Sequence, residues 1–275
     1  MNSRFRETGN KGLYDNGVSG FITTNEKRQA RANWVARQGF NQYACYGMSE
    51  YMKTNPSWVA DFITKLRANG IPDIGFIYSK SSSVTGTLDT YQRNQISETT
   101  KFSFIVSEIE QYNTGLVTEF YNIIKITSNY ALVNNLTRCI YQGWPSQADM
   151  NKIVKYSDRM FLHAYGRYDL KADVGKWAFS YQSGRFNQIH KAIDLLTGDA
   201  GTTKYSVQTI FSTENPDTTK TQFGAKYFKR NTWEEPYSLF IGGWNSAATA
   251  AMKRRITIAG SVLFVGGQAI KIKPV

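Results

Sequence analysis

The feature that most constrains the fold is an alternation of short apolar runs with longer segments of helical periodicity along the whole chain. Strands alternating with helices favour a parallel sheet. The runs with the length and composition of strands are residues 17–24, 40–47, 71–79, 101–113, 136–145, 158–167, 205–213 and 261–268. The segments expected to be helical are residues 25–39, 56–70, 116–135, 146–157, 185–196 and 246–260, with a weaker signal in 80–100.

Eight such units in 275 residues match the size of a closed (β/α)₈ barrel, the TIM barrel. No break in composition divides the chain, so we expect a single domain over residues 1–275. The alternative is an open, doubly wound sheet, which usually carries a glycine-rich phosphate loop after its first strand. The stretch ITTNEKRQ, residues 22–29, lacks those glycines, and the sequence therefore favours the barrel.

Charge and cysteine content exclude several function classes. The net charge is +12, but the basic residues are scattered except for Lys253–Arg255, and no RNA-binding or zinc-finger pattern occurs. We therefore do not expect nucleic acid as a partner. Two cysteines, Cys45 and Cys139, and two histidines are too few for a disulfide framework or a Cys/His metal site, so no metal or other cofactor is expected.

No apolar run is long enough to span a membrane, since about 18 residues are needed. The first twelve residues do not have the pattern of a signal peptide. A secreted or periplasmic location is expected only if a leader has been removed before them.

Two carboxylates lie near the end of the fourth expected strand. Alternate side chains of a strand share a face, so Val106, Glu108 and Glu110 point one way while Ile105 and Ile109 point the other. Apolar residues suit the face that packs on helices, so both glutamates are expected to point into the barrel, with Glu110 nearest the mouth. A buried carboxylate costs several kcal/mol unless it is paired or protonated, which argues against chance placement.

A purely structural role for these glutamates is the alternative. Glu108 would then pair with an inward arginine, such as Arg138 on the fifth strand or Arg167 after the sixth.

Further polar and aromatic side chains are expected at the same end of the barrel, where active sites of this fold lie. Each taken alone is more often a core residue, but together they suit sugar rings, because aromatic rings stack on apolar sugar faces and amides bind hydroxyl groups. These candidates are Tyr46, Gln142, Trp144, His163, Tyr165, Gln208 and Glu214, while the face of Tyr78 is ambiguous.

The stretch FSFIVSEIEQYN resembles the fourth strand of chitinase-type barrels, glycoside hydrolase family 18, which ends in alternating acidic residues with the catalytic acid last. LHAYGRYD loosely resembles the sixth strand of that family, and there only Tyr165 of the Met-x-Tyr element carries over, because His163 replaces the Met. The acidic run is incomplete, since Glu108 and Val106 stand two and four residues before Glu110. The eighth expected strand also lacks the family's Trp.

The resemblance implies a glycoside hydrolase acting on a polysaccharide or glycan. Glu110 would protonate the glycosidic oxygen, and like-charge repulsion from Glu108 would keep that proton available. The acetamido oxygen of the substrate would be the nucleophile, oriented by Tyr165. A second scheme pairs two carboxylates across the bond, here Glu110 and Glu214.

Two other functions remain open at this stage. The incomplete acidic run also fits a carbohydrate-binding barrel that has lost the chemistry, with Trp144, Tyr165 and Trp233 as contacts. A metal-dependent hydrolase is less favoured, because it needs several His and Asp at strand ends and the chain offers only His163. Two interpretations of the aromatic-rich loop 214–245 after strand seven stay open: a lid or subsite wall, or a loop packed by its own aromatic residues.

Overall fold

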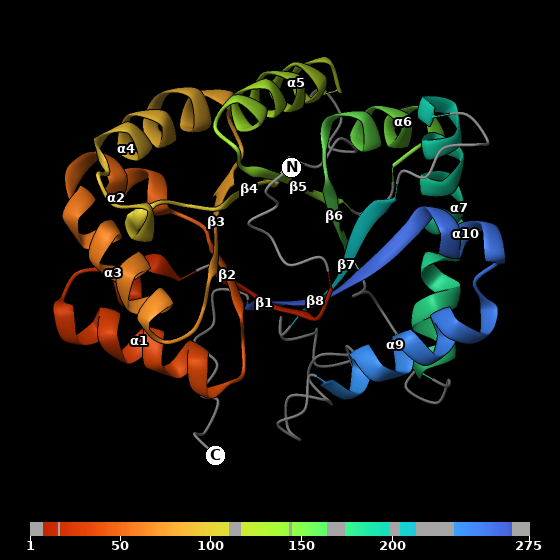
Figure 1. The fold of residues 1–275 in the computed structure, drawn as a ribbon, viewed down its shortest axis with the longest axis horizontal. Coiled ribbons are helices and arrows are strands. Elements are labelled where there is room, and N and C mark those ends of the chain that lie inside the picture. Colours follow the sequence, from red (N-terminus) through yellow and green to blue (C-terminus); the bar gives the residue numbers. More distant parts are fainter. Residues whose placement is uncertain are drawn as a thin grey trace, which may run out of the picture.

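Eight parallel strands pair in chain order from β1 to β8, and β8 pairs with β1, so the sheet closes into a barrel (Figure 1). The computed structural model describes residues 8–15, 17–109, 117–142, 145–163, 174–197, 204–212 and 234–265. The predicted (β/α)₈ barrel is therefore confirmed, and the open doubly wound sheet is excluded. The strands are β1 (Asn10–Asp15), β2 (Gln42–Cys45), β3 (Asp73–Tyr78), β4 (Phe104–Ser107), β5 (Thr137–Gln142), β6 (Arg159–His163), β7 (Tyr205–Ser212) and β8 (Ile256–Val265).

The first strand is the one that the sequence pattern misplaced. Residues 17–24 were expected to be a strand, but they form a short 3₁₀ helix, η1 (Val18–Gly20), and turns, while β1 lies at 10–15. The apolar side chains of this stretch, such as Ile22 at 0% exposure, are buried in the core shared with the helices. Burial of a turn, rather than pairing in the sheet, explains its hydrophobic character.

Helices surround the barrel, and side-chain caps begin several of them. Thr24 caps α1 by accepting a hydrogen bond from the backbone of Lys27. Ser146 and Asp149 form a capping box at α6. The helices are α1 (Asn25–Arg37), α2 (Met48–Thr54), α3 (Pro56–Ala68), α4 (Asp89–Asn94), α5 (Val117–Val133), α6 (Gln147–Tyr156), α7 (Val174–Thr197), α9 (Glu234–Ala247) and α10 (Ala250–Arg255), with the π-helix η2 (Ser83–Leu88) and the 3₁₀ helix η3 (Glu98–Thr100).

Two predictions about the last quarter of the chain were wrong in part. The helix expected over 246–260 ends at Arg255, because the β-branched Ile256, Thr257 and Ile258 join β8 instead. The end of the expected loop 214–245 is helix α9. Its residues Phe240 and Trp244 are buried four positions apart on one face, a helical spacing that the neighbouring glycines obscured.

The sheet separates two apolar cores. The outer core lies between the strands and the helices and is the larger one. The inner core fills the barrel and is rich in aromatic rings. Its members are Tyr14, Ala44, Ile77, Phe104, Val106, Cys139, Tyr141, Phe161, Ile210 and Val262, with Phe264 packed against them.

The amino-terminal end of the barrel interior is closed by polar side chains, which we call the floor network: Gln42, Arg159, Ser206 and Gln208. Arg159 donates to Ser206 Oγ and to Gln208 Oε1, both at 2.8 Å, and Gln208 Nε2 donates to Gln42 Oε1 at 2.9 Å. Gln42 and Arg159 are the first residues of β2 and β6, which places the network at that end.

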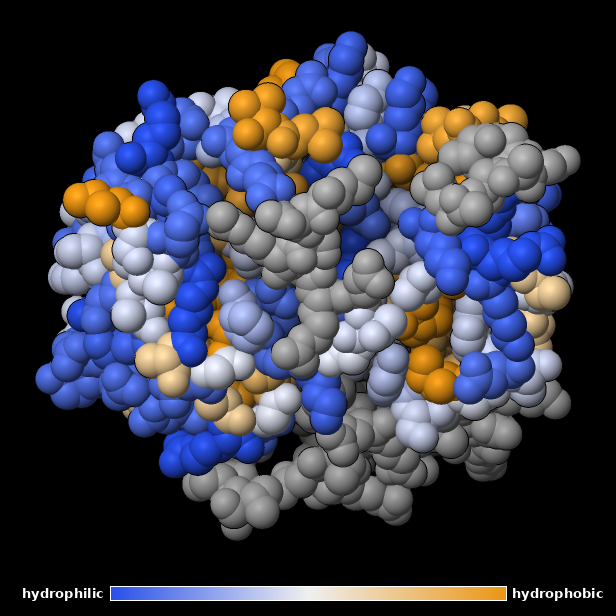
Figure 2. Space-filling view, in the orientation of Figure 1, coloured by the Kyte–Doolittle hydropathy of each residue, from blue (hydrophilic) through white to orange (hydrophobic). Residues whose placement is uncertain are grey.

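The surface seen in Figure 2 is mostly polar, with a small apolar patch over α5. Exposed apolar side chains on that helix are Ile126, Leu132 and Val133. Among the helices that the structure describes, none is both long and apolar enough to cross a membrane.

Candidate active site

The candidate site lies at the carboxyl ends of the strands, the end of a (β/α)₈ barrel at which active sites form. Strand β4 brings the glutamates there. Phe104 and Val106 are buried in the inner core, whereas Ile105 and Ile109 are buried in the outer core. This is the alternation that the sequence predicted for the strand. Glu108 is the first residue beyond β4.

Glu108 is held in place through its backbone. Its amide donates to the carbonyl oxygen of Tyr78 at 2.9 Å, which continues the hydrogen-bond ladder between β3 and β4 past the last strand residue. Glu108 is partly exposed, in contrast to the buried Val106 before it. A carboxylate at this position can therefore reach solvent and a ligand at the mouth.

Tyr46 follows the last residue of β2 in the same way. Its amide donates to the carbonyl oxygen of Asp15 at 2.9 Å, and its side chain is 36% exposed. Cys45 before it belongs to the outer core and Ala44 to the inner core. Alternation therefore places Tyr46 on the barrel side, at the mouth, and its exposure leaves the ring available to a ligand.

Gln142 is the last residue of β5, and it is fully buried. Its Nε2 donates to the carbonyl oxygen of Ile109 at 3.2 Å. It alternates with Tyr141 of the inner core, so it lies on the helix-facing side of the strand. Gln142 is therefore better placed to hold the chain that leaves β4 than to contact a ligand directly.

Gln208 faces the barrel interior, as strand parity predicts, but it lies deep. It belongs to the floor network, four residues before the end of β7 at Ser212, which corresponds to roughly 13 Å along a strand. Burial, offset in part by nearby Cys139 and Asp73, lowers the pKa of Arg159 to about 10. Gln208 therefore accepts a hydrogen bond from a buried cation far below the mouth.

The remaining predicted site residues are only partly within the described chain. His163 is the last residue of β6 and pairs in register with Ile210, but its side chain lies outside the described part. The other candidates outside the described residues are Glu110, Trp144, Tyr165 and Glu214, together with Trp233.

Arg138 does not face into the barrel, so the alternative in which it pairs with Glu108 is wrong. Its guanidinium forms an ion pair with Asp158 and donates to Ser128 Oγ of α5 at 2.8 Å. It alternates with Cys139 of the inner core and therefore points outward. The other proposed partner, Arg167, lies outside the described residues.

Tyr78, whose face was ambiguous from the sequence, belongs to the outer core. Its hydroxyl lies 2.7 Å from Thr127 Oγ1 of α5. Burial raises the pKa of this phenol to about 12. Tyr78 thus fastens a helix to the barrel instead of lining the mouth.

Sequence reasoning missed three aromatic residues of the inner core. Tyr14, Tyr141 and Phe264 surround the upper interior, with the ring of Tyr14 5.2 Å from that of Phe264 and 6.4 Å from that of Tyr141. Tyr14 was overlooked because β1 was placed later in the chain. For Tyr141 the usable signal was its spacing from Cys139: residues two apart in a strand lie on the same face.

A metal centre finds no support among the described residues, where no three His, Cys, Asp or Glu side chains lie together.

Comparisons with known proteins bear on the fold. No family model matches the chain, and no curated protein matches it. A solved structure of a Rhizomucor miehei beta-1,3-glucanosyltransferase, an active-site mutant in complex with laminaritriose, matches with a TM-score of 0.54 at 10% identity. The match covers 93% of this chain and 86% of that one.

Weaker matches include both glycosidases and other enzymes. A chitinase from Chromobacterium violaceum has a TM-score of 0.48 at 11% identity, over 81% of this chain and 75% of that one. A dihydropteroate synthase from Xanthomonas albilineans has a TM-score of 0.42 at 9% identity, over 94% and 87%. At 10% identity the glucanosyltransferase match shows the (β/α)₈ barrel fold and no specific activity.

Proposed function

We propose that the protein is a glycoside hydrolase that acts on a polysaccharide or glycan, with Glu110 as the general acid. The alternation of β4 carries the proposal. Val106 is buried inside the barrel and Ile109 is buried under the helices. The residues on either side of Ile109 are Glu108 and Glu110, and the same alternation predicts that both side chains point toward the mouth.

Two further observations support this proposal. The floor network and the aromatic inner core fill the barrel below the strand ends, so a ligand would bind at the level of Glu108 and Tyr46. The glucanosyltransferase that shares the fold is a carbohydrate-active enzyme, which adds support by analogy of fold.

In the proposed mechanism, Glu110 donates a proton to the glycosidic oxygen as the bond breaks. Repulsion from Glu108 disfavours loss of that proton before the substrate binds. The positive charge that develops on the sugar is stabilised either by the substrate's acetamido oxygen, oriented by Tyr165, or by Glu214 acting as a nucleophile. Tyr46 would stack on a sugar ring at the rim.

The test is the Glu110→Gln variant, assayed for release of reducing ends from chitin, laminarin and related glycans. Loss of a general acid should lower the rate by about 10²–10⁴-fold while the protein stays folded. Glu119→Gln, the same change on exposed α5, is the matched control and should keep full activity. Full turnover by Glu110→Gln on a glycan that the wild type cleaves would refute the assignment.

A carbohydrate-binding barrel without catalysis is the second candidate. It is favoured by the acidic run, in which Val106 occupies a position that is acidic in chitinase-type barrels and is buried among apolar side chains here. This candidate expects glycan binding with no product after long incubation. Detection of reducing ends above those released by Glu110→Gln would exclude it.

A further inference from the structure

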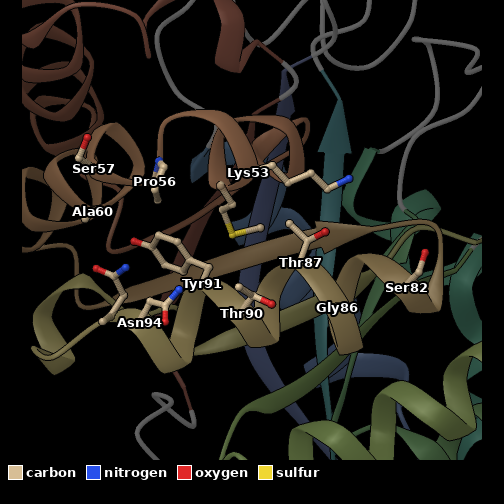
Figure 3. Close-up of a pocket in the computed structure, with 12 residues that line it drawn as sticks. Lys53, Pro56, Ser57, Ala60, Ser82, Gly86, Thr87, Thr90, Tyr91 and Asn94 are labelled. Carbon is tan, nitrogen blue, oxygen red and sulfur yellow. The ribbon is translucent and has the colours of Figure 1, made fainter.

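A groove of about 870 Å³ opens on the side of the barrel between two helical walls (Figure 3). One wall is α2 and the start of α3, and the other is η2 and α4. These segments follow β2 and β3 directly in the chain, so each wall begins at the carboxyl end of a strand. Its volume falls within the usual range for ligand sites, about 300–1,000 Å³.

The lining of the groove is neutral and rich in hydrogen-bonding groups. Among the residues that the structure describes, no carboxylate lines it, and Lys53 is the one charged residue of the lining. The uncharged polar side chains around it are Ser57, Ser82, Thr87, Thr90, Asn94 and Gln95.

These hydroxyl and amide groups are not engaged by other described residues of the protein. Other threonines of the same elements bond back to the carbonyl four residues earlier, as Thr85 of η2 does to Ser81 at 3.2 Å and Thr64 of α3 does to Ala60 at 2.9 Å. Thr87 and Thr90 make no such bond within the described chain. Their hydroxyls are therefore free to bind a ligand.

The base of the groove is apolar, because Met52 and Tyr91 are buried beneath it. Figure 3 shows Thr87, Thr90 and Asn94 along the η2–α4 wall, with Lys53 opposite them. The wall includes a π-helix, an uncommon element that often occurs at functional sites. Hydroxyls and amides at the sides and an apolar base match a sugar chain, which presents hydroxyls at its edges and C–H groups on its faces.

We propose that this groove is a secondary binding site for a neutral polysaccharide chain, outside the mouth. The inference rests on the proposed function for the class of ligand, but it uses a separate set of residues. The absence of carboxylates and the presence of only one amine disfavour a strongly charged polymer.

Thr87→Arg tests the site by placing a long cationic side chain in the groove. Thr85→Arg is the matched control, since it makes the same change two residues away on η2 at an exposed position that does not line the groove. Retardation in native gels that contain laminarin, glycol chitin or hydroxyethylcellulose measures binding without requiring catalysis. Thr87→Arg should weaken the dissociation constant at least tenfold, and Thr85→Arg should leave it unchanged.

A second variant guards against a folding defect. Asn94→Ala combined with Gln95→Ala removes two amides from exposed and partly exposed positions and should weaken binding about threefold or more. Wild-type retardation that survives in both groove variants would overturn the groove proposal while leaving the proposed function standing. If the groove variants lose retardation and the wild type hydrolyses no glycan, the groove proposal is supported and the hydrolase proposal is rejected. No retardation of the wild type in any gel would overturn the groove proposal.

Discussion

Tyr78 offers a quantitative test of how the barrel packs against its helices. The side chain is 4% exposed, and its hydroxyl is 2.7 Å from Thr127 Oγ1. Burial raises the pKa of this phenol from 10 to about 12. A group whose pKa is higher in the folded state contributes stability that is fully present below pH 10 and is lost as the pH rises through 12.

The size of the effect follows from linkage. With a pKa of 10 in the unfolded chain and about 12 in the folded protein, Tyr78 should lose about 1.4 kcal/mol of its contribution by pH 11. Tyr78→Phe removes this dependence and should cost about 1 kcal/mol at pH 7, because one hydrogen bond is lost. Thr127 Oγ1 still donates to the carbonyl of Ile123 at 2.8 Å, which limits that cost.

The variant should therefore be less stable than the wild type at pH 7 and equal or slightly more stable at pH 11. Urea unfolding, monitored by tryptophan fluorescence at pH 7, 9 and 11, measures the free energy of unfolding of the wild type and of the variant. The contributions of the other tyrosines cancel in the difference between the two proteins. Phe76→Leu, a buried neighbour without a titratable group, should show the same deficit at every pH. A Tyr78→Phe deficit that does not change between pH 7 and 11 would refute the reasoning.

Three further predictions concern stability and can be measured by thermal and urea unfolding. Gly260 has φ +138°, and an added Cβ would collide with the backbone of Asn10. Gly260→Ala should therefore lower the free energy of unfolding by more than about 2 kcal/mol. A fully stable variant would contradict the register of β1 and β8. Ser146→Ala removes the cap of α6 and should cost about 1 kcal/mol, whereas no change would mean that water replaces the cap. Gln208→Leu removes one hydrogen-bond acceptor of buried Arg159 and should lower the free energy of unfolding by about 2 kcal/mol or more. If the floor network is as described, adding Arg159→Met should restore part of that loss.

The barrel plan was predictable because seven of the eight strands are apolar runs bounded by helical signals. The exception, β1, is six residues long and contains only two large apolar side chains, Leu13 and Tyr14. The stretch after it is more hydrophobic, because Phe21 and Ile22 are buried in a turn. Hydrophobicity reports burial, and a buried turn and a strand cannot be separated by burial alone.

The sequence predicted which face of a strand a candidate side chain lies on, but not how far that side chain lies from the mouth of the barrel. Strand parity gave the correct side for Val106 and for Gln208. It could not show that Gln208 lies in the floor, since a period of two repeats along the whole strand. Gln142 alternates with Tyr141, whose ring lies inside the barrel, so strand parity places Gln142 on the helix-facing side.

The packing of the interior limits how deep in the barrel a ligand can bind. Gly75 lacks a side chain where the ring of Phe104 crosses the barrel, and an added Cβ there would collide with that ring. Phe104 in turn packs against Phe161 with ring centroids 6.3 Å apart. A barrel filled in this way leaves no room for a sugar at that depth. Under the proposed function, the ligand would therefore have to bind beyond Val106, the last inner-core side chain of β4, and the next residue on that face of the strand is Glu108.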